Sequence, residues 1–162
     1  CYYQLPPYLS CNNVIYIGPG RSIDRLYPYN SRPSNLYNYY GGFSQADYAV
    51  QDLTSLFLSG DTYALDRITP YDGHVRVVQD GRYCYSVDVG DFYDLMRDAA
   101  YGTQTVSYDA YVQGRTGWGS YVVQARHTLI DPWGSWVTYN QRFVFETEGR
   151  RLVVREISVS PQ

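Results

Sequence analysis

The sequence contains no lysine, only two histidines and one methionine, and no run of apolar residues long enough to cross a bilayer. Its 13 basic residues are all arginine and stand against 16 acidic residues, which gives a net charge of -3. A chain of this charge lacks the clustered basic surface that nucleic-acid-binding proteins present. These absences argue against a transmembrane helix and against nucleic acid as a partner.

What the sequence does contain is enough apolar material for one ordinary domain, with 162 residues of which 44% are hydrophobic. It also contains 20 tyrosines. Tyrosine and arginine are enriched at the energetic centres of protein interfaces. The composition therefore fits a protein that makes contacts through its surface, and a compositional bias of the lineage is the alternative explanation.

The three cysteines bear on the compartment. Cys1, at the first position, resembles the lipidated cysteine of a mature bacterial lipoprotein, and Tyr2 in place of an inner-membrane Asp favours the outer membrane. If Cys1 is lipidated, Cys11 and Cys84 form an even pair that predicts one disulfide in an oxidising compartment. A free Cys1, a bridge from Cys1 to another subunit, or an arbitrary chain boundary are the alternatives. We expect an extracytoplasmic protein, either an outer-membrane lipoprotein or extracellular, that meets a membrane only through this anchor.

Residues 1–43 form a segment of their own, with nine tyrosines and five prolines. This density of proline, glycine and asparagine supports no helix. Disordered segments are poor in aromatic residues, so we expect this arm to lie extended against a surface of its own domain or of a neighbour. The sequence thus predicts an arm, 1–43, followed by a domain, 44–162.

The domain follows a clear order of elements. Ser44 and the apolar spacing after it predict a helix that ends at Gly60, and Asp61 predicts the start of a short helix that stops before Pro70. Asp80-Gly81 predicts a tight hairpin. A third helix and four long strands complete the order, so that the predicted elements are helices 44–60, 61–68 and 88 or 91–102, and strands 75–78, 83–87, 103–113, 118–130, 135–147 and 150–159.

This order of elements resembles the NTF2-like superfamily. The resemblance covers roughly residues 44–160 and depends on residues 57–61 (Phe-Leu-Ser-Gly-Asp), the strand at Val75, the helix at Asp91 and the strand 152–157 (Leu-Val-Val-Arg-Glu-Ile). It implies an α+β cone, in which three helices cover a curved antiparallel sheet. The superfamily includes cyclases, isomerases and dehydratases as well as non-catalytic assembly domains, so the resemblance implies a fold more than a function.

Turn positions allow an estimate of which residues face the helices. We expect Gln113 opposite Trp118, Ile130 opposite Ser135, and Glu146 opposite Arg151. Alternation along each strand then sorts the sheet into two faces. It places a polar set inside the cone: Tyr108, His127, Asn140, Arg142 and Arg155. It places an apolar patch on the outer face, against which the arm would dock: Phe143, Phe145, Leu152 and Val154.

Arg142 and Arg155 come out nearly opposite each other on adjacent strands. Two like charges in that position need an acid or an anion between them. Asp47, Asp52 and Asp94 on the covering helices are the candidate partners, and a small anionic ligand is the alternative.

The sequence offers little catalytic chemistry. It has no Gly-x-Ser-x-Gly elbow, no His-Glu-x-x-His motif and no phosphate loop, and its two histidines predict neither a metal site nor a cofactor. No carboxylate falls beside His127 on the inward strand positions. We therefore expect a non-catalytic scaffold that binds itself or other envelope or extracellular subunits through its arm and sheet face. A small-molecule-binding or lyase- or isomerase-like pocket and a glycan-contacting surface are the alternatives.

Overall fold

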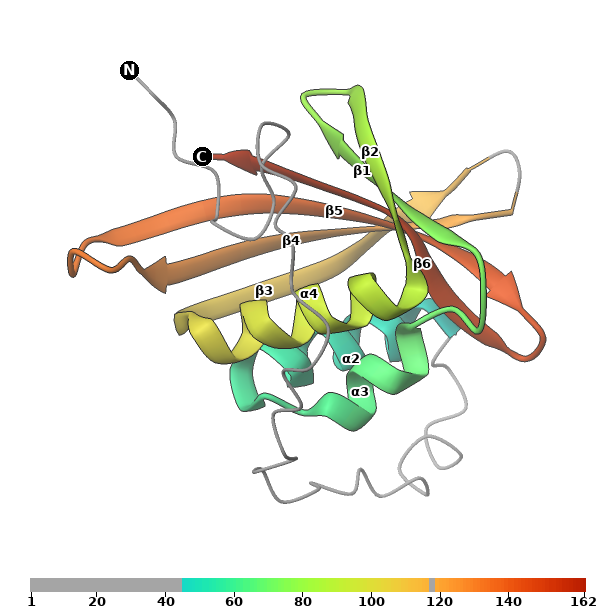
Figure 1. The fold of residues 1–162 in the computed structure, drawn as a ribbon, viewed down its shortest axis with the longest axis horizontal. Helices are drawn as coiled ribbons and strands as arrows, with labels where there is room; N and C mark the ends of the chain where they lie inside the picture. Colours follow the sequence, from blue (N-terminus) through green and yellow to red (C-terminus); the bar gives the residue numbers. More distant parts are fainter. Residues whose placement is uncertain (1–44, 117–118) are drawn as a thin grey trace.

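The computed structural model of the chain describes residues 45–116 and 119–162. The predicted arm, with Cys1 and Cys11, lies outside the described residues. The described part contains three helices and six strands (Figure 1). Their bounds are α2 Gln45–Ser59, α3 Thr62–Ile68, β1 His74–Gln79, β2 Arg82–Asp88, α4 Val89–Gly102, β3 Gln104–Arg115, β4 Tyr121–Ile130, β5 Trp136–Glu148 and β6 Arg151–Pro161.

The ends of the helices follow the signals in the sequence. Gly60 adopts a positive φ of 66° and its N–H donates to the carbonyl of Leu56, which ends α2. The carboxylate of Asp61 accepts from the backbone N–H of Tyr63 and Ala64 and so begins α3. Asp88 caps α4 in the same way. Local capping chemistry therefore sets where each helix begins or ends.

The strands form one sheet in the order β2-β1-β6-β5-β4-β3. The long strands β3 to β6 pair antiparallel, whereas β1 pairs with β6 in parallel. The sheet is therefore mixed, whereas the prediction was a purely antiparallel sheet. All three helices cover one side of the strongly curved sheet (Figure 1). This α+β cone is the predicted architecture.

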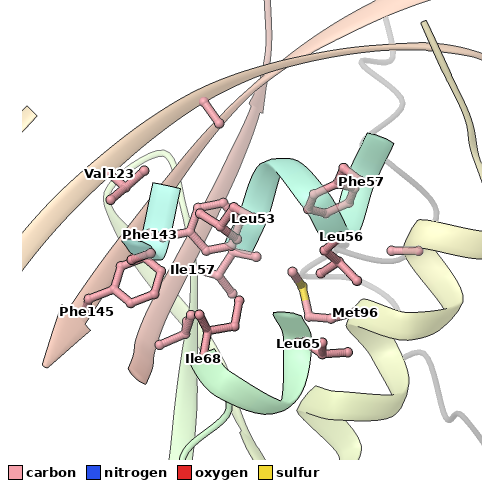
Figure 2. Close-up of a cluster of buried hydrophobic side chains, with 14 of the residues drawn as sticks. Leu53, Leu56, Phe57, Leu65, Ile68, Met96, Val123, Phe143, Phe145 and Ile157 are labelled. Carbon is pink, nitrogen blue, oxygen red and sulfur yellow. The ribbon is translucent and has the colours of Figure 1, made fainter. Parts of the chain in front are cut away.

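The hydrophobic core lies between this concave face and the helices. Phe143, Phe145 and Ile157 point from the sheet towards Leu53 of α2 and Ile68 of α3 (Figure 2). All five side chains are at most 1% exposed. Burial of a large apolar side chain stabilises the folded state by about 1.5–3 kcal/mol. This core ties the sheet to α2 and α3.

The position of Phe143 and Phe145 corrects the prediction that they form an outer apolar patch. Ile130 pairs with Trp136 and not with Ser135, because the turn after Asp131 contains one more residue than expected. A slip of one residue moves every side chain of a strand to the other face. The odd-numbered residues of β5 consequently face the helices.

A second irregularity corrects the prediction for β6. Val144 pairs with Glu156, but Phe145 pairs with Val154, so Arg155 is the extra residue of a β-bulge. The bulge lets Leu152 and Val154 face the core together with Ile157 and Val159. The predicted pair of Glu146 and Arg151 is also wrong, because Arg151 pairs with Glu148 across a tighter turn.

Two further observations concern the predicted compartment. No helix in the described part of the chain is long and apolar enough to cross a membrane. Cys84 on β2 is disulfide-bonded. Its predicted partner Cys11 and the alternative Cys1 both lie outside the described residues, so the pairing and the lipidation of Cys1 stay predictions.

Candidate functional site

A row of polar and aromatic side chains crosses the concave face near the β4–β5 turn. Tyr108 on β3 pairs with His127 on β4, which in turn pairs with Tyr139 on β5. Gln141 follows two residues after Tyr139 on the same face. His127 and Gln141 are fully buried, and Tyr108 and Tyr139 are at most 6% exposed. Buried polar groups require hydrogen-bond partners, and this row supplies them.

Three side chains of the row, those of Tyr108, Gln141 and His127, are linked by hydrogen bonds to one another and to Thr105. The Tyr108 hydroxyl donates to Gln141 Oε1 over 2.9 Å. Gln141 Nε2 therefore faces His127 Nδ1, 3.4 Å away, as the donor, and His127 Nε2 donates to Thr105 Oγ1 over 2.8 Å. These partners assign the neutral His127 tautomer that carries its proton on Nε2. The chain Tyr108–Gln141–His127–Thr105 is hereafter the interior network.

Phe57, near the C-terminus of α2, lies against the interior network. Its ring stacks on Tyr108 with centroids 4.7 Å apart and an angle of 18° between the planes. Its centroid is also 4.8 Å from that of His127. Aromatic contacts of this kind contribute about 0.5–1.5 kcal/mol beyond the area that they bury. The helix thus fixes the orientation of both polar rings.

Burial sets the charge state of His127. Removal from water lowers the pKa of its imidazole from 6.5 to about 4, because the charged form loses its hydration. His127 is therefore neutral near pH 7. In this neutral form the imidazole accepts a hydrogen bond from Gln141 at Nδ1 and donates one to Thr105 from Nε2.

The buried carboxylate of α2 belongs to another set of contacts. Asp52 Oδ1 accepts from Arg67 Nε over 3.1 Å and from Nη2 over 2.9 Å. This ion pair joins α2 to α3 through two charge-assisted hydrogen bonds. In residues 45–116 and 119–162, no group of three or more His, Cys, Asp or Glu residues could hold a metal ion.

The predicted site residues fall into two groups. Tyr108 and His127 lie on the helix-covered face, where alternation placed them, and whether they bind a ligand stays a prediction. Asn140 and Arg142 belong to the even-numbered set of β5 and lie on the outer face, because of the slip at the Asp131 turn. Arg155 occupies the bulge of β6. The structure therefore does not bring the predicted five residues together.

The two arginines also have different partners from those expected. Arg142 Nη1 lies 3.1 Å from Glu156, which is also held by Arg76 at 3.0 Å. Arg155 Nη2 lies 2.8 Å from Glu148. The prediction that Arg142 and Arg155 share one acid or anion is wrong. Arg142 pairs with Glu156, which it shares with Arg76, and Arg155 pairs with Glu148.

Sequence reasoning missed three members of this site: Phe57, Thr105 and Gln141. Strict alternation from Tyr108 would put Thr105 on the outer face, but a bulge between Thr105 and Ser107 turns it inwards. Gln141 was missed because the predicted register of β5 was wrong by one residue, which put the odd-numbered residues on the outer face. The signal that could have found it is composition, because the odd-numbered set of β5, with Val137, Tyr139, Phe143 and Phe145, is the more apolar one.

No protein-family model and no curated protein matches this sequence. Solved structures match the fold. A putative isomerase from Rhodopseudomonas palustris aligns with a TM-score of 0.55 and 11% identity over 74% of this chain and 92% of its own. A DUF4783 family protein from Bacteroides uniformis aligns with a TM-score of 0.54 and 12% identity over 69% and 95%.

A third solved structure is an NTF2-like protein of unknown function in nutrient uptake from Rhodospirillum rubrum. It aligns with a TM-score of 0.53 and 16% identity over 74% of this chain and 99% of its own. At such low identity these similarities establish the architecture alone. The chemistry of the site has to come from its own residues.

Proposed function

We propose that this NTF2-like domain is a non-catalytic binding component of an extracytoplasmic assembly, and that it docks its partners on the outer face of its sheet. The observation that carries the proposal is the state of His127. This histidine faces the cone interior, is neutral, and directs both ring nitrogens at the neutral side chains of Gln141 and Thr105. A general base needs a ring nitrogen that can reach a substrate proton, and both nitrogens of His127 are already engaged with these two side chains. We therefore assign His127 a structural role.

The carboxylates support the same conclusion. A catalytic pair in such a cone would combine His127 or a tyrosine with an acid whose proton can move. Asp52, the buried acid of α2, is held by Arg67 instead. Its Oδ1 accepts both hydrogen bonds from the Arg67 guanidinium, so this oxygen joins α2 to α3. The interior thus favours packing and hydrogen bonding over proton transfer.

The outer face offers a docking surface of suitable chemistry. At its centre Glu156 is held between Arg76 and Arg142, whose side chains are 54% and 39% exposed. Val144 lies beside them, as the cross-strand partner of Glu156. Two arginines around one glutamate leave a net positive charge. Arginine is enriched in interfaces because its planar guanidinium both stacks and forms paired hydrogen bonds.

The compartment forms part of the proposal. A disulfide-bonded Cys84 supports an oxidising environment, because cytoplasmic thiols are kept reduced. The arm, residues 1–43, would supply additional contact to the same partners. Self-association is the first case to test, since a surface with both a glutamate and two arginines can pair with a copy of itself.

Sedimentation velocity of the full chain at micromolar concentration tests the proposal. We expect an oligomer that Arg142→Glu converts to a monomer by placing two acids side by side. Arg82→Glu makes the same charge change on the exposed β2 edge and should leave the oligomer intact. A full chain that stays monomeric over the whole concentration range, or an oligomer indifferent to Arg142→Glu, would reject self-association through this face.

A further inference from the structure

We propose that the end of the outer sheet face next to the β4–β5 turn binds a neutral oligosaccharide. Trp136 would provide the stacking platform, and the hydroxyl and amide side chains beside it would provide the hydrogen bonds. This inference goes beyond the assembly role and uses other residues. Either one can fail while the other holds.

Two tryptophans are exposed at this end of the molecule. Trp133 in the turn is 71% exposed and Trp136 at the start of β5 is 70% exposed. Tryptophan is on average highly buried in folded proteins, so two such exposed indoles need an explanation. The turn that carries them extends beyond the layer of helices (Figure 1). It is therefore open to a ligand as large as a polysaccharide.

The turn is held in shape by its own hydrogen bonds. Asp131 Oδ1 accepts from the backbone N–H of Trp133 over 2.9 Å and of Ser135 over 2.8 Å. The Asp131 N–H donates to the Ser135 carbonyl, and Gly134, with a φ of 84°, donates back to the Asp131 carbonyl. The backbone that carries the indoles is thus ordered before any ligand arrives, which lowers the entropic cost of binding.

A polar surface continues from Trp136 along the sheet. Thr138 and Asn140 follow Trp136 on the same strand and the same face, each about 7 Å further on. The hydroxyl of Thr138 lies 2.9 Å from that of Thr128, its cross-strand partner. Trp136 and Asn140 together span about 13 Å by the same strand geometry, the scale of a short oligosaccharide.

The next row of this surface is also polar and nearly balanced in charge. Asn140 pairs with Arg126, which in turn pairs with Asp109 on β3. Arg126 Nη2 also donates to Gln162 Oε1 over 3.2 Å. The guanidinium therefore has a carboxylate neighbour on β3 and an amide partner just after β6. The surface is therefore complementary to a ligand that has many hydroxyl groups and no net charge.

This chemistry favours a sugar over the two other possible ligands of such a surface, which are a second protein and a lipid membrane. A sugar has a C–H face that stacks on an indole and a rim of hydroxyls that bond to threonine and asparagine. A stable protein interface buries about 800 Å² per partner around an apolar centre, whereas the rows behind Trp136 are polar. Attraction to anionic lipids needs basic residues around the tryptophans, and the charged residue of the turn is Asp131.

Affinity electrophoresis of the full chain tests this inference, in native gels that contain starch, xyloglucan, galactomannan or mixed-linkage β-glucan. We expect at least one of these neutral polysaccharides to retard the chain. Trp136→Ala should weaken the retardation at least tenfold, and Trp136→Phe should preserve part of it. Tyr83→Ala serves as the matched control, because it removes an aromatic side chain from β2 that is 64% exposed, against 70% for Trp136. Circular dichroism confirms that each variant is folded.

The outcomes separate this site from the assembly face. The Arg142→Glu variant should be retarded by the polysaccharide as strongly as the parent chain. The Trp136→Ala variant should sediment as the same oligomer as the parent chain. The inference is overturned if none of the four polysaccharides retards the chain, or if Trp136→Ala is retarded as strongly as the parent. Co-sedimentation with phosphatidylcholine vesicles, or loss of the oligomer in Trp136→Ala, would assign the tryptophans to a membrane or to a second copy and would overturn it as well.

Discussion

Burial of His127 predicts a specific loss of stability in mild acid. Its pKa is about 4 in the folded protein against 6.5 for an ordinary histidine, so between these values the unfolded chain binds a proton that the folded chain does not. The contribution of His127 to stability is complete above pH 6.5, falls as the pH decreases towards 4, and levels off below that. A pKa difference of about 2.5 corresponds to about 3 kcal/mol at 1.36 kcal/mol per pKa unit.

Replacement of His127 by asparagine removes this term while a hydrogen-bonding side chain remains. We expect His127→Asn to lose about 1–3 kcal/mol near pH 7, because Thr105 and Gln141 lose well-placed partners. More importantly, the parent chain should lose about 2.5 kcal/mol more than this variant between about pH 7.5 and about pH 4.5. The carboxylates titrate in both proteins and cancel in the difference.

Urea unfolding followed by far-ultraviolet circular dichroism at several pH values gives the free energies of unfolding. His74→Gln is the control, because it removes the exposed histidine of β1 and leaves the buried His127 in place. The imidazole proton signals of His127 in nuclear magnetic resonance should also stay unchanged down to about pH 5. Parallel curves for the parent and His127→Asn would refute the argument, since they would mean that His127 binds its proton equally in both states.

Two further predictions concern ion pairs. Glu148→Gln should cost about 1–2 kcal/mol, because Glu148 accepts from Arg155 and from the backbone N–H of Tyr71 and so ties the loop before β1 to the β5–β6 hairpin. Glu146→Gln, an exposed neighbour, should change the urea midpoint little, and equal midpoints for both variants would contradict this role. Asp52→Asn should lower the free energy of unfolding by about 2 kcal/mol through loss of a largely buried anion paired with a guanidinium, and an unchanged thermal midpoint would contradict it.

The sequence was most informative where a single residue determines the local backbone. Gly60 and Asp61 mark the boundary between α2 and α3, as expected from their capping chemistry. Asp80-Gly81 forms the predicted hairpin turn, with both residues at positive φ. These signals act over a few residues, so they are visible without knowledge of the rest of the fold.

The register of the sheet could not be obtained in the same way. The Asp131 turn and the bulge at Arg155 each shift the alternation by one residue. The length of the turn depends on hydrogen bonds that Asp131 makes within residues 131–135, whereas the bulge depends on the pairing of β5 with β6. The shift moved Asn140 and Arg142 out of the cone and brought Gln141 in.

The corrected register changes what the cone is able to recognise. With Arg142 bound to Glu156 outside, and Arg155 bound to Glu148 at the hairpin end, the charges that were expected inside the sheet lie elsewhere. The interior network is neutral, so any interaction there depends on hydrogen bonds of fixed polarity and on the stacked ring of Phe57. The charges organise the outer face instead, around Glu156. A charged group placed beside the interior network would lose its hydration, whereas the ion pairs around Glu156 lie on the outer face of the sheet, so the proposed contact with charged partners belongs to that face.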